Sequence, residues 1–334
     1  MDIDADGIER LAAEQRFSGV VRVDRGDELV LAKAFGCADR RHDIPNTPAT
    51  QIGIASGSKG FTALTIVRLI ELGALELATT ARSLLGSDLP LIDDRVTVEQ
   101  LLCHRSGIGD YLDEDELGDI NDHVLTRPPH ELATTEGFLP MLDGHPMAFT
   151  PGERFAYCNG GFVVLALLAE RATGGSFHDL VGEHVIDRAG LGATAYLRSD
   201  ELPGSAAVGY LDVDGLRTNV LHLPVRGNGD GGIFTTAADV HALWIALVAS
   251  RIVSRPWVEE MTRDHHLDPA ASDQYGLGFW LRADCGVVQL EGYDAGASFC
   301  SLHRPHDGLT CTVLSNTSNG AWPRTKHLEA ELGL

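Results

Sequence analysis

Strand-like runs lie at both ends of this chain, and helical patterns fill its middle. Residues 17–23 and 28–36 are rich in β-branched and aromatic side chains, and Asp24-Arg25-Gly26-Asp27 between them is typical of a hairpin turn. Three more such runs come near the C-terminus: residues 287–290, 298–302 and 309–314. We therefore predict an α+β fold with one antiparallel sheet that is built from both chain ends.

The helical patterns predict the layers that cover this sheet. Helices are expected over residues 3–15, 56–72, 97–103, 131–142, 161–172, from 235 or 236 to 249, and 325–332. The sequence has no repeats and no low-complexity linker. We expect residues 1–75 and 230–334 to form the sheet region and residues 76–229 to form a mainly helical region. A functional site is expected between the two.

The composition is that of a soluble globular protein with an excess of acid. Of its 334 residues, 44% are hydrophobic, and the formal net charge is −22. This charge argues against nucleic acid or an anionic membrane as a partner, because the phosphates would be repelled. No apolar run reaches the ~18 residues of a membrane span, and the acidic N-terminus has no signal-peptide pattern. Six scattered cysteines without a C-x-x-C pair are typical of a reduced protein, so we expect a cytoplasmic location.

A serine and a lysine stand three residues apart at the start of the predicted helix 56–72. This spacing places Ser56 and Lys59 on one helix face, within reach of each other. A serine hydroxyl becomes a good nucleophile when a neighbouring base takes its proton, and a desolvated lysine can be that base. Chance alone can produce one such match, so the pair is a hypothesis that needs support from the rest of the chain.

A second polar group, Tyr157-Cys158-Asn159, precedes the predicted helix 161–172. A tyrosine near a serine and a lysine can share or shuttle a proton, provided that the cation lowers its pKa from about 10. Asn159 could hydrogen-bond a substrate amide or hold the lysine in place. The alternative to these catalytic and binding roles, for this segment by itself, is a buried structural tyrosine next to an asparagine in a turn.

Together, these motifs resemble the serine β-lactamase-like family, which includes class C β-lactamases, D,D-peptidases, D-aminopeptidases and esterases of the same fold. The matching blocks, in the family's order, are Ser56-Gly57-Ser58-Lys59, residues 101–108 (L-L-C-H-R-S-G-I), Tyr157-Cys158-Asn159, residues 231–240 and Tyr275-Gly276-Leu277-Gly278-Phe279. Each block is weak by itself, but their common order is specific. The resemblance covers nearly the whole chain and implies the β-lactamase/transpeptidase-like fold.

The resemblance also implies roles for the matching residues. Ser56 would be the acylated nucleophile, Lys59 its principal proton acceptor and Tyr157 a partner base or acid. Asn159 would contact the substrate. The backbone N–H of Ser56, near a helix N-terminus, suits an oxyanion hole. No metal and no cofactor is implied, and the expected partner is a small-molecule substrate.

The family's third motif is altered in this chain. The family usually shows Lys-Thr-Gly or His-x-Gly on the strand beside the pocket, whereas residues 292–299 contain neither lysine nor histidine. Tyr293 is expected at the place of the histidine, and Gly296 is the expected second oxyanion donor, with Ala297 as the alternative. Asp294, if it faces the cleft, would disfavour anions and favour an amine. Its alternative is a solvated aspartate in a turn.

These observations predict a serine hydrolase that forms an acyl-enzyme with small esters, amides or D-amino-acid derivatives. Acylation by β-lactams stays open, although the missing cation removes an anchor for their carboxylate. The competing hypothesis is a non-hydrolytic penicillin-binding, sensing or scaffold protein of the same fold. His104 is expected to be structural, and the glycine-rich segment 228–232 to be a mobile loop near the pocket rim. The sequence does not give the oligomeric state.

Overall fold

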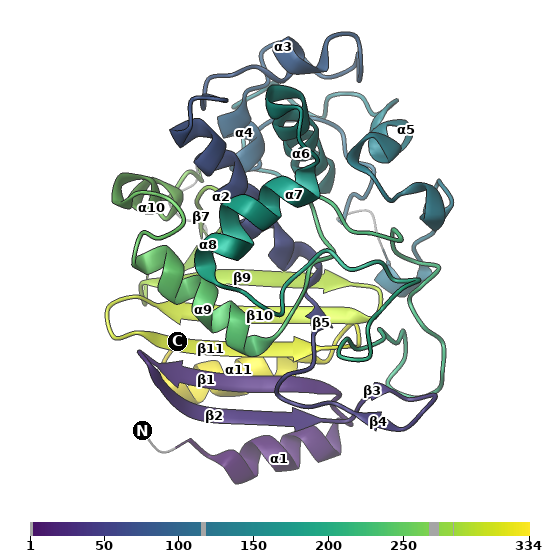
Figure 1. The fold of residues 1–334 in the computed structure, drawn as a ribbon, viewed down its shortest axis with the longest axis vertical. Helices are drawn as coiled ribbons and strands as arrows, with labels where there is room; N and C mark the ends of the chain where they lie inside the picture. The colour runs from purple at the N-terminus through teal and green to yellow at the C-terminus, as the bar shows by residue number, and fades with distance from the viewer. Residues whose placement is uncertain (1–2, 115–117, 267–273, 283) are drawn as a thin grey trace.

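One seven-stranded antiparallel sheet carries the fold (Figure 1). The computed structural model describes residues 3–114, 118–266, 274–282 and 284–334. In spatial order the strands are β2 (Glu28–Phe35), β1 (Gly19–Arg25), β11 (Leu309–Ser315), β10 (Ala297–Arg304), β9 (Val287–Asp294), β8 (Trp280–Arg282) and β7 (Gln274–Tyr275). The pairing of β1 with β11 joins the N-terminal hairpin to the C-terminal strands. The prediction of one sheet built from both chain ends is confirmed.

Helices cover both faces of this sheet, and each face has its own apolar core. In the pairing of β1 with β11, Val21 lies opposite Val313, and Val20 lies opposite Leu314. Because side chains alternate along a strand, the first pair faces one core and the second pair faces the other. The smaller core is covered by α1 (Ala5–Glu14) and α11 (Ala321–Leu332), and the larger one contains α2 (Ser58–Glu71), α6 (Asn159–Thr173) and α9 (Ala237–Val248).

The remaining elements are short and lie mostly between α2 and α9 along the chain. The α-helices are α3 (Ala81–Leu85), α4 (Val98–Leu102), α5 (Leu139–Leu142), α7 (Phe177–Val181), α8 (Asp187–Ala189) and α10 (Arg255–Met261). The short 3₁₀-helices are η1 (Ala55–Gly57), η2 (Ile120–Asp122), η3 (Pro129–Glu131) and η4 (Thr135–Phe138), and η5 (Gly182–Ile186) is a short π-helix. The small strands are β3 (Cys37–Asp39) with β4 (Ile44–Pro45), and β5 (Ile52–Gly53) with β6 (Phe234–Thr235). Across the described ranges, we find no helix with the length and apolarity needed to cross a membrane.

Two predicted helices differ clearly from the structure, and each has a proline in the first turn of an observed helix. The expected helix over 131–142 is divided into η3, η4 and α5. Pro140 cannot donate the backbone hydrogen bond of a helix interior, so it lies in the first turn of the new helix α5. The last helix begins at Ala321 rather than at residue 325, and Pro323 falls within its first turn. The division of the chain at residues 75 and 229 stays a prediction.

Candidate active site

A tight, strained turn presents Ser56 just before α2. Ser56 is the middle residue of η1, and Ala55 before it has a φ of 45°. This left-handed conformation costs a non-glycine residue on the order of 1 kcal/mol. Ser58 stabilises the turn, because its Oγ donates to Ala55 O at 2.8 Å and accepts the Ile233 N–H at 3.0 Å. The result is a serine whose side chain stands at the start of a buried helix and lines two adjoining cavities.

Lys59, one turn further along α2, is buried and directed at this serine. Its Nζ donates to Ser56 Oγ at 2.9 Å, to Asn159 Oδ1 at 2.8 Å and to Asp230 O at 2.8 Å. The residue is only 2% exposed. Burial lowers the pKa of Lys59, and the carboxylates of Asp230 and Glu114 oppose this shift. A lysine with a lowered pKa that contacts a serine hydroxyl is suited to accept its proton.

The Tyr157 ring lies next to the same amine. Lys59 Nζ is 4.9 Å from the ring centroid. Burial raises the pKa of Tyr157 well above 10, and a hydrogen bond with the Ser56 side chain opposes the rise. Burial thus shifts this pKa in the direction opposite to the lowering that the sequence analysis required. Tyr157 is a neutral hydroxyl, suited to donate and relay a proton and not to act as a resident base.

His104 holds the backbone on both sides of Tyr157. Its carbonyl oxygen accepts the Ala156 N–H at 2.9 Å, and its Nδ1 accepts the Cys158 N–H at 3.0 Å. The imidazole also packs on the Tyr157 ring, with centroids 4.3 Å apart. Burial lowers the pKa of His104 well below 6.5, and the nearby Lys59 adds to this effect. His104 is thus a neutral imidazole that positions Tyr157, in line with the structural role that we expected.

The side-chain amide of Asn159 is occupied by protein contacts. Its Oδ1 accepts from Lys59, and its Nδ2 donates to Leu112 O and to Glu114 Oε1, each at 3.0 Å. Of the two roles considered for Asn159, the geometry supports holding the lysine rather than binding the substrate. Asp110 fixes the helix end itself, because its carboxylate accepts the N–H groups of Asn159 and Gly160.

The glycine-rich segment 228–232 is held in place and completes the lysine site. Thr62 Oγ1 donates to Gly229 O at 2.6 Å, and the Tyr196 hydroxyl donates to Asn228 O at 2.9 Å. Gly229 has no room for a side chain, because an added Cβ would lie 2.1 Å from Phe162 O. The expectation of a mobile loop was wrong, because these contacts fix the Asp230 carbonyl on Lys59. The Asp230 carboxylate accepts from the Tyr111 hydroxyl, and burial raises its pKa.

Strand β9 passes directly beside the turn that carries Ser56. An added Cβ on Gly292 would lie 2.1 Å from Ile54 O and 2.8 Å from the Ser56 nitrogen. Only glycine permits this approach. Alternation along the strand then directs Asp294 to the face of Gly292 and directs Glu291 and Tyr293 to the other face. The Tyr293 ring accordingly lies 6.4 Å from that of Trp322 on α11.

The prediction that Gly296 donates to an oxyanion was wrong. Gly296 lies in the turn between β9 and β10, and its N–H already donates to Ser318 Oγ at 2.8 Å. The alternative, Ala297, pairs with Asp294 next to this two-residue turn. The pair that flanks a two-residue turn is hydrogen-bonded, so the next pair, Tyr293 with Ser298, is not. The Tyr293 N–H therefore points away from β10, to the other edge of β9. That edge faces the Ser56 turn.

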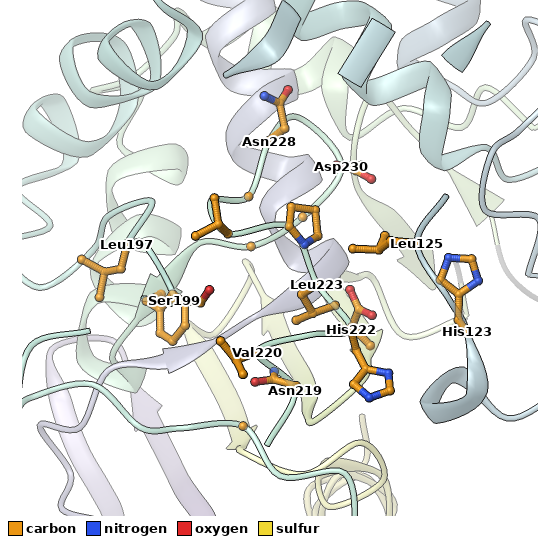
Figure 2. A pocket seen from close by; sticks show the side chains of 18 of the residues that line it. His123, Leu125, Leu197, Ser199, Asn219, Val220, His222, Leu223, Asn228 and Asp230 are labelled. Atoms are coloured by element: carbon orange, nitrogen blue, oxygen red, sulfur yellow. The ribbon is translucent and has the colours of Figure 1, made fainter. Parts of the chain in front are cut away.

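Two cavities meet at Ser56, one on each side of the end of β9. The first, here called the loop cavity, has a volume of about 350 Å³ and is lined in part by the segment 218–225 (Figure 2). Asp294 and Asp230 line it, together with apolar side chains such as Leu125 and Leu223. The second, here called the aromatic cavity, has a volume of about 500 Å³. Its walls include Tyr157, Trp280, Tyr293 and Trp322.

Asp294 faces the loop cavity and is not a solvated turn residue. Burial raises its pKa to about 7, the Ala295 N–H opposes this shift, and the charges of Asp230 and Glu114 add to it. Sequence reasoning missed Asp230 and Trp322. A backbone carbonyl carries no local signal, and neither does a cavity wall that lies 23 residues after residue 299. Glu114 could have been suspected from the acidic run 113–116 alone.

The role of His104 predicts different outcomes for two substitutions. His104→Asn retains an acceptor near the place of Nδ1 and tolerates the φ of 54° at this position, whereas His104→Phe retains a ring but leaves the Cys158 N–H unpaired. We expect the phenylalanine variant to lose about 1–3 kcal/mol of unfolding free energy in urea from this group and to lose more turnover than the asparagine variant. Equal turnover in both variants would show that the hydrogen bond does not position Tyr157.

Gly292→Ala tests the close approach of β9. The new methyl group must push the strand away from Ser56, so we expect kcat to fall by about 10² or more, the size of a lost oxyanion donor. Gly204→Ala is the matched control, since an added Cβ there meets no atom within 4 Å. A Gly292→Ala enzyme with normal kcat on an activated ester would contradict the assignment.

Comparison with known proteins agrees with this geometry. The family model described as Beta-lactamase matches residues 5–333. A penicillin-binding protein from Bacillus halodurans has 34% sequence identity and a TM-score of 0.90, over 97% of this chain and 99% of that one. The D-aminopeptidase of Brucella canis is 33% identical over 322 residues, which are 95% of this chain and 60% of that protein.

A further solved structure, the octameric penicillin-binding protein homologue from Pyrococcus abyssi, has 25% identity and a TM-score of 0.82 over 99% of this chain and 78% of that one. This chain therefore spans a little over half the length of the D-aminopeptidases it matches, and nearly all of the Bacillus halodurans structure. The matches extend over the strands, the Ser56 turn and the helices alike. The chain belongs to the beta-lactamase family of serine hydrolases and has its fold.

Proposed function

We propose that this protein hydrolyses small esters or amides through an acyl-enzyme on Ser56. The observation that carries the proposal is the 2.9 Å contact between Ser56 Oγ and the buried Lys59 Nζ. Burial lowers the pKa of Lys59, so its neutral amine is more accessible than that of an exposed lysine. No other base is needed to activate the serine.

Each half of the reaction follows from the positions of three groups. Lys59 accepts the Ser56 proton as Oγ forms a bond to the acyl carbon. The tetrahedral intermediate then expels the alcohol or amine, which takes a proton from Lys59 directly or through the Tyr157 hydroxyl. In the second half, water gives its proton to the same pair and attacks the acyl carbon. The bond to Oγ breaks, and Ser56 regains its proton.

Two backbone N–H groups are placed to stabilise the oxyanion. One is that of Ser56, at the turn that precedes α2, where the helix N-terminus favours negative charge. The other, in this proposal, is that of Tyr293, because Gly292 lies against the Ser56 nitrogen and the Tyr293 N–H points away from β10. Tyr293 thus contributes its backbone to the reaction and its side chain to the aromatic cavity.

The charges near Ser56 favour a substrate with an amine over one with a carboxylate. Glu114, Asp200, Asp230 and Asp294 line the loop cavity, against Arg41 as its one described arginine or lysine, and Glu114 lines the aromatic cavity as well. An ammonium group there would pair with Asp294, whereas a carboxylate would be repelled. Several relatives are named D-aminopeptidases, which supports amides or esters of D-amino acids as the substrates.

Intact-protein mass spectrometry with p-nitrophenyl acetate tests the acyl-enzyme. We expect a transient mass increase of one acetyl group together with steady release of p-nitrophenol. Both should disappear in Ser56→Ala, and Lys59→Ala should lower kcat by about 10²–10⁴ because the general base is lost. A persistent adduct without turnover would instead indicate a penicillin-binding or sensing protein. Full turnover in Ser56→Ala would refute the nucleophile.

Asp294→Asn should change both substrate preference and pH dependence. We expect kcat/KM for D-alanine p-nitroanilide to fall at least tenfold, while p-nitrophenyl acetate, which has no amine, is affected much less. Because the pKa of Asp294 rises to about 7 on folding, the folded state holds its proton more tightly than the unfolded state does. Wild-type stability should therefore decline as the pH rises from about 4 to 7, by up to a few kcal/mol, and the asparagine variant should lack this decline.

Urea unfolding of both proteins at pH 4, 6 and 8 measures the second effect. The difference between the variant and the wild type isolates Asp294 from other titrating groups, such as the buried His104. A difference that does not grow with pH would show that Asp294 is ionised freely in the folded protein. Equal activity of the wild type and the variant on the anilide would show that Asp294 does not recognise the substrate amine.

A further inference from the structure

The aromatic cavity is bounded by four aromatic side chains and opens directly at Ser56. Tyr157 and Trp280 form one wall, with ring centroids 6.0 Å apart and nearly parallel planes. Trp322 and Tyr293 form another, with ring centroids 6.4 Å apart. Faces of tryptophan and tyrosine attract cations through their ring quadrupole, tryptophan most strongly.

The first wall is fixed before any ligand arrives. The Trp280 ring packs at nearly a right angle against Tyr275, with ring centroids 4.8 Å apart and planes at 87°, and its centroid lies 6.0 Å from that of Phe155. Tyr157 is held from behind by His104. A wall that is already ordered costs little conformational entropy when a ligand binds, so more of the contact energy remains for affinity.

The polar lining of this cavity has a single sign of charge. Three carboxylates line it, those of Asp113, Glu114 and Glu291, and none of its described lining residues is lysine, arginine or histidine. Glu291 accepts from Gln289 Nε2 at 2.6 Å, which orients its carboxylate.

We propose that the aromatic cavity binds an organic ammonium group of the substrate, with Trp280 and Trp322 as its aromatic walls and Glu291 as its counter-charge. Alternation along β9 separates this site from the loop cavity, since Glu291 and Asp294 lie on opposite faces of the strand. The inference rests on the proposed function, because it places the ammonium group on a substrate whose acyl carbon reacts with Ser56. It assigns a site distinct from that of Asp294.

Calorimetry with the Ser56→Ala protein tests the site without any chemistry. Benzyltrimethylammonium is the probe, and benzyl alcohol is the uncharged comparison. We expect the cation to bind and the alcohol to bind at least tenfold more weakly. Glu291→Gln and Trp322→Leu should each raise the Kd of the cation about fivefold or more. Glu259→Gln removes the same charge from an exposed position on α10 and should leave the Kd unchanged.

Two esters that differ only in charge test the same site during turnover. Butyrylcholine and 3,3-dimethylbutyl butyrate have nearly the same shape and give the same acyl-enzyme. We expect butyrylcholine to have the higher kcat/KM, by about tenfold, and Glu291→Gln to reduce this ratio while the neutral ester is still cleaved. Circular dichroism melting shows whether a weak variant is folded.

The outcomes separate this inference from the proposed function. Cation binding that depends on Glu291, in a protein that hydrolyses neither ester, would retain the site and refute the hydrolase. Hydrolysis of both esters at equal kcat/KM, with no calorimetric preference for the cation, would refute the site and retain the hydrolase. Loss of cation binding in Asp294→Asn, with normal binding in Glu291→Gln, would place the cation in the loop cavity and overturn the assignment.

Discussion

The hydrogen bonds of the buried Lys59 amine hold the candidate site together. Its three acceptors come from places far apart in the sequence: the η1 turn, the first residue of α6 and the carbonyl of residue 230. An amine removed from water is costly unless such partners receive its protons. Each of these segments is fixed in turn, by Ser58, by Asp110 and by Thr62. Removing any acceptor would leave a buried donor unpaired, so the geometry around Ser56 depends on all three.

The sheet contributes a strand edge to this arrangement. β8 pairs with β9 only up to Gln289, so the edge of β9 from Glu291 onward lies open beside the Ser56 turn. Gly292 permits close contact with that turn, and the alternation of the strand sends neighbouring carboxylates into different cavities. One strand therefore presents the N–H that we propose as a backbone donor and divides the space on its two sides. A one-residue shift in its register would exchange the two sets of side chains.

The sequence predicted what local spacing controls and missed what folding brings together. The contact of Ser56 with Lys59 follows from one helical turn, and the sheet follows from runs of strand-forming residues at both chain ends. The state of Tyr157 could not be read in this way, because burial raises its pKa and burial is a property of the whole fold. The donor was misplaced at Gly296 because strand register decides which N–H groups face the edge. The carbonyl of Asp230 has no sequence signature, since every residue has one.

The burial of Lys59, the proposed base, is opposed by the acidic side chains around it. Burial lowers the pKa of Lys59, and Asp230, Glu114, Asp110 and Asp294 all act in the opposite direction. The net effect is a lowered Lys59 pKa. A substrate ammonium that pairs with one of these carboxylates would weaken their support for the charged lysine. Binding of a cation would then favour the neutral amine that accepts the Ser56 proton. By this argument an anionic substrate is disfavoured in two ways. The carboxylates that line the cavities repel it, and its own negative charge would stabilise the protonated form of Lys59, which cannot accept the Ser56 proton.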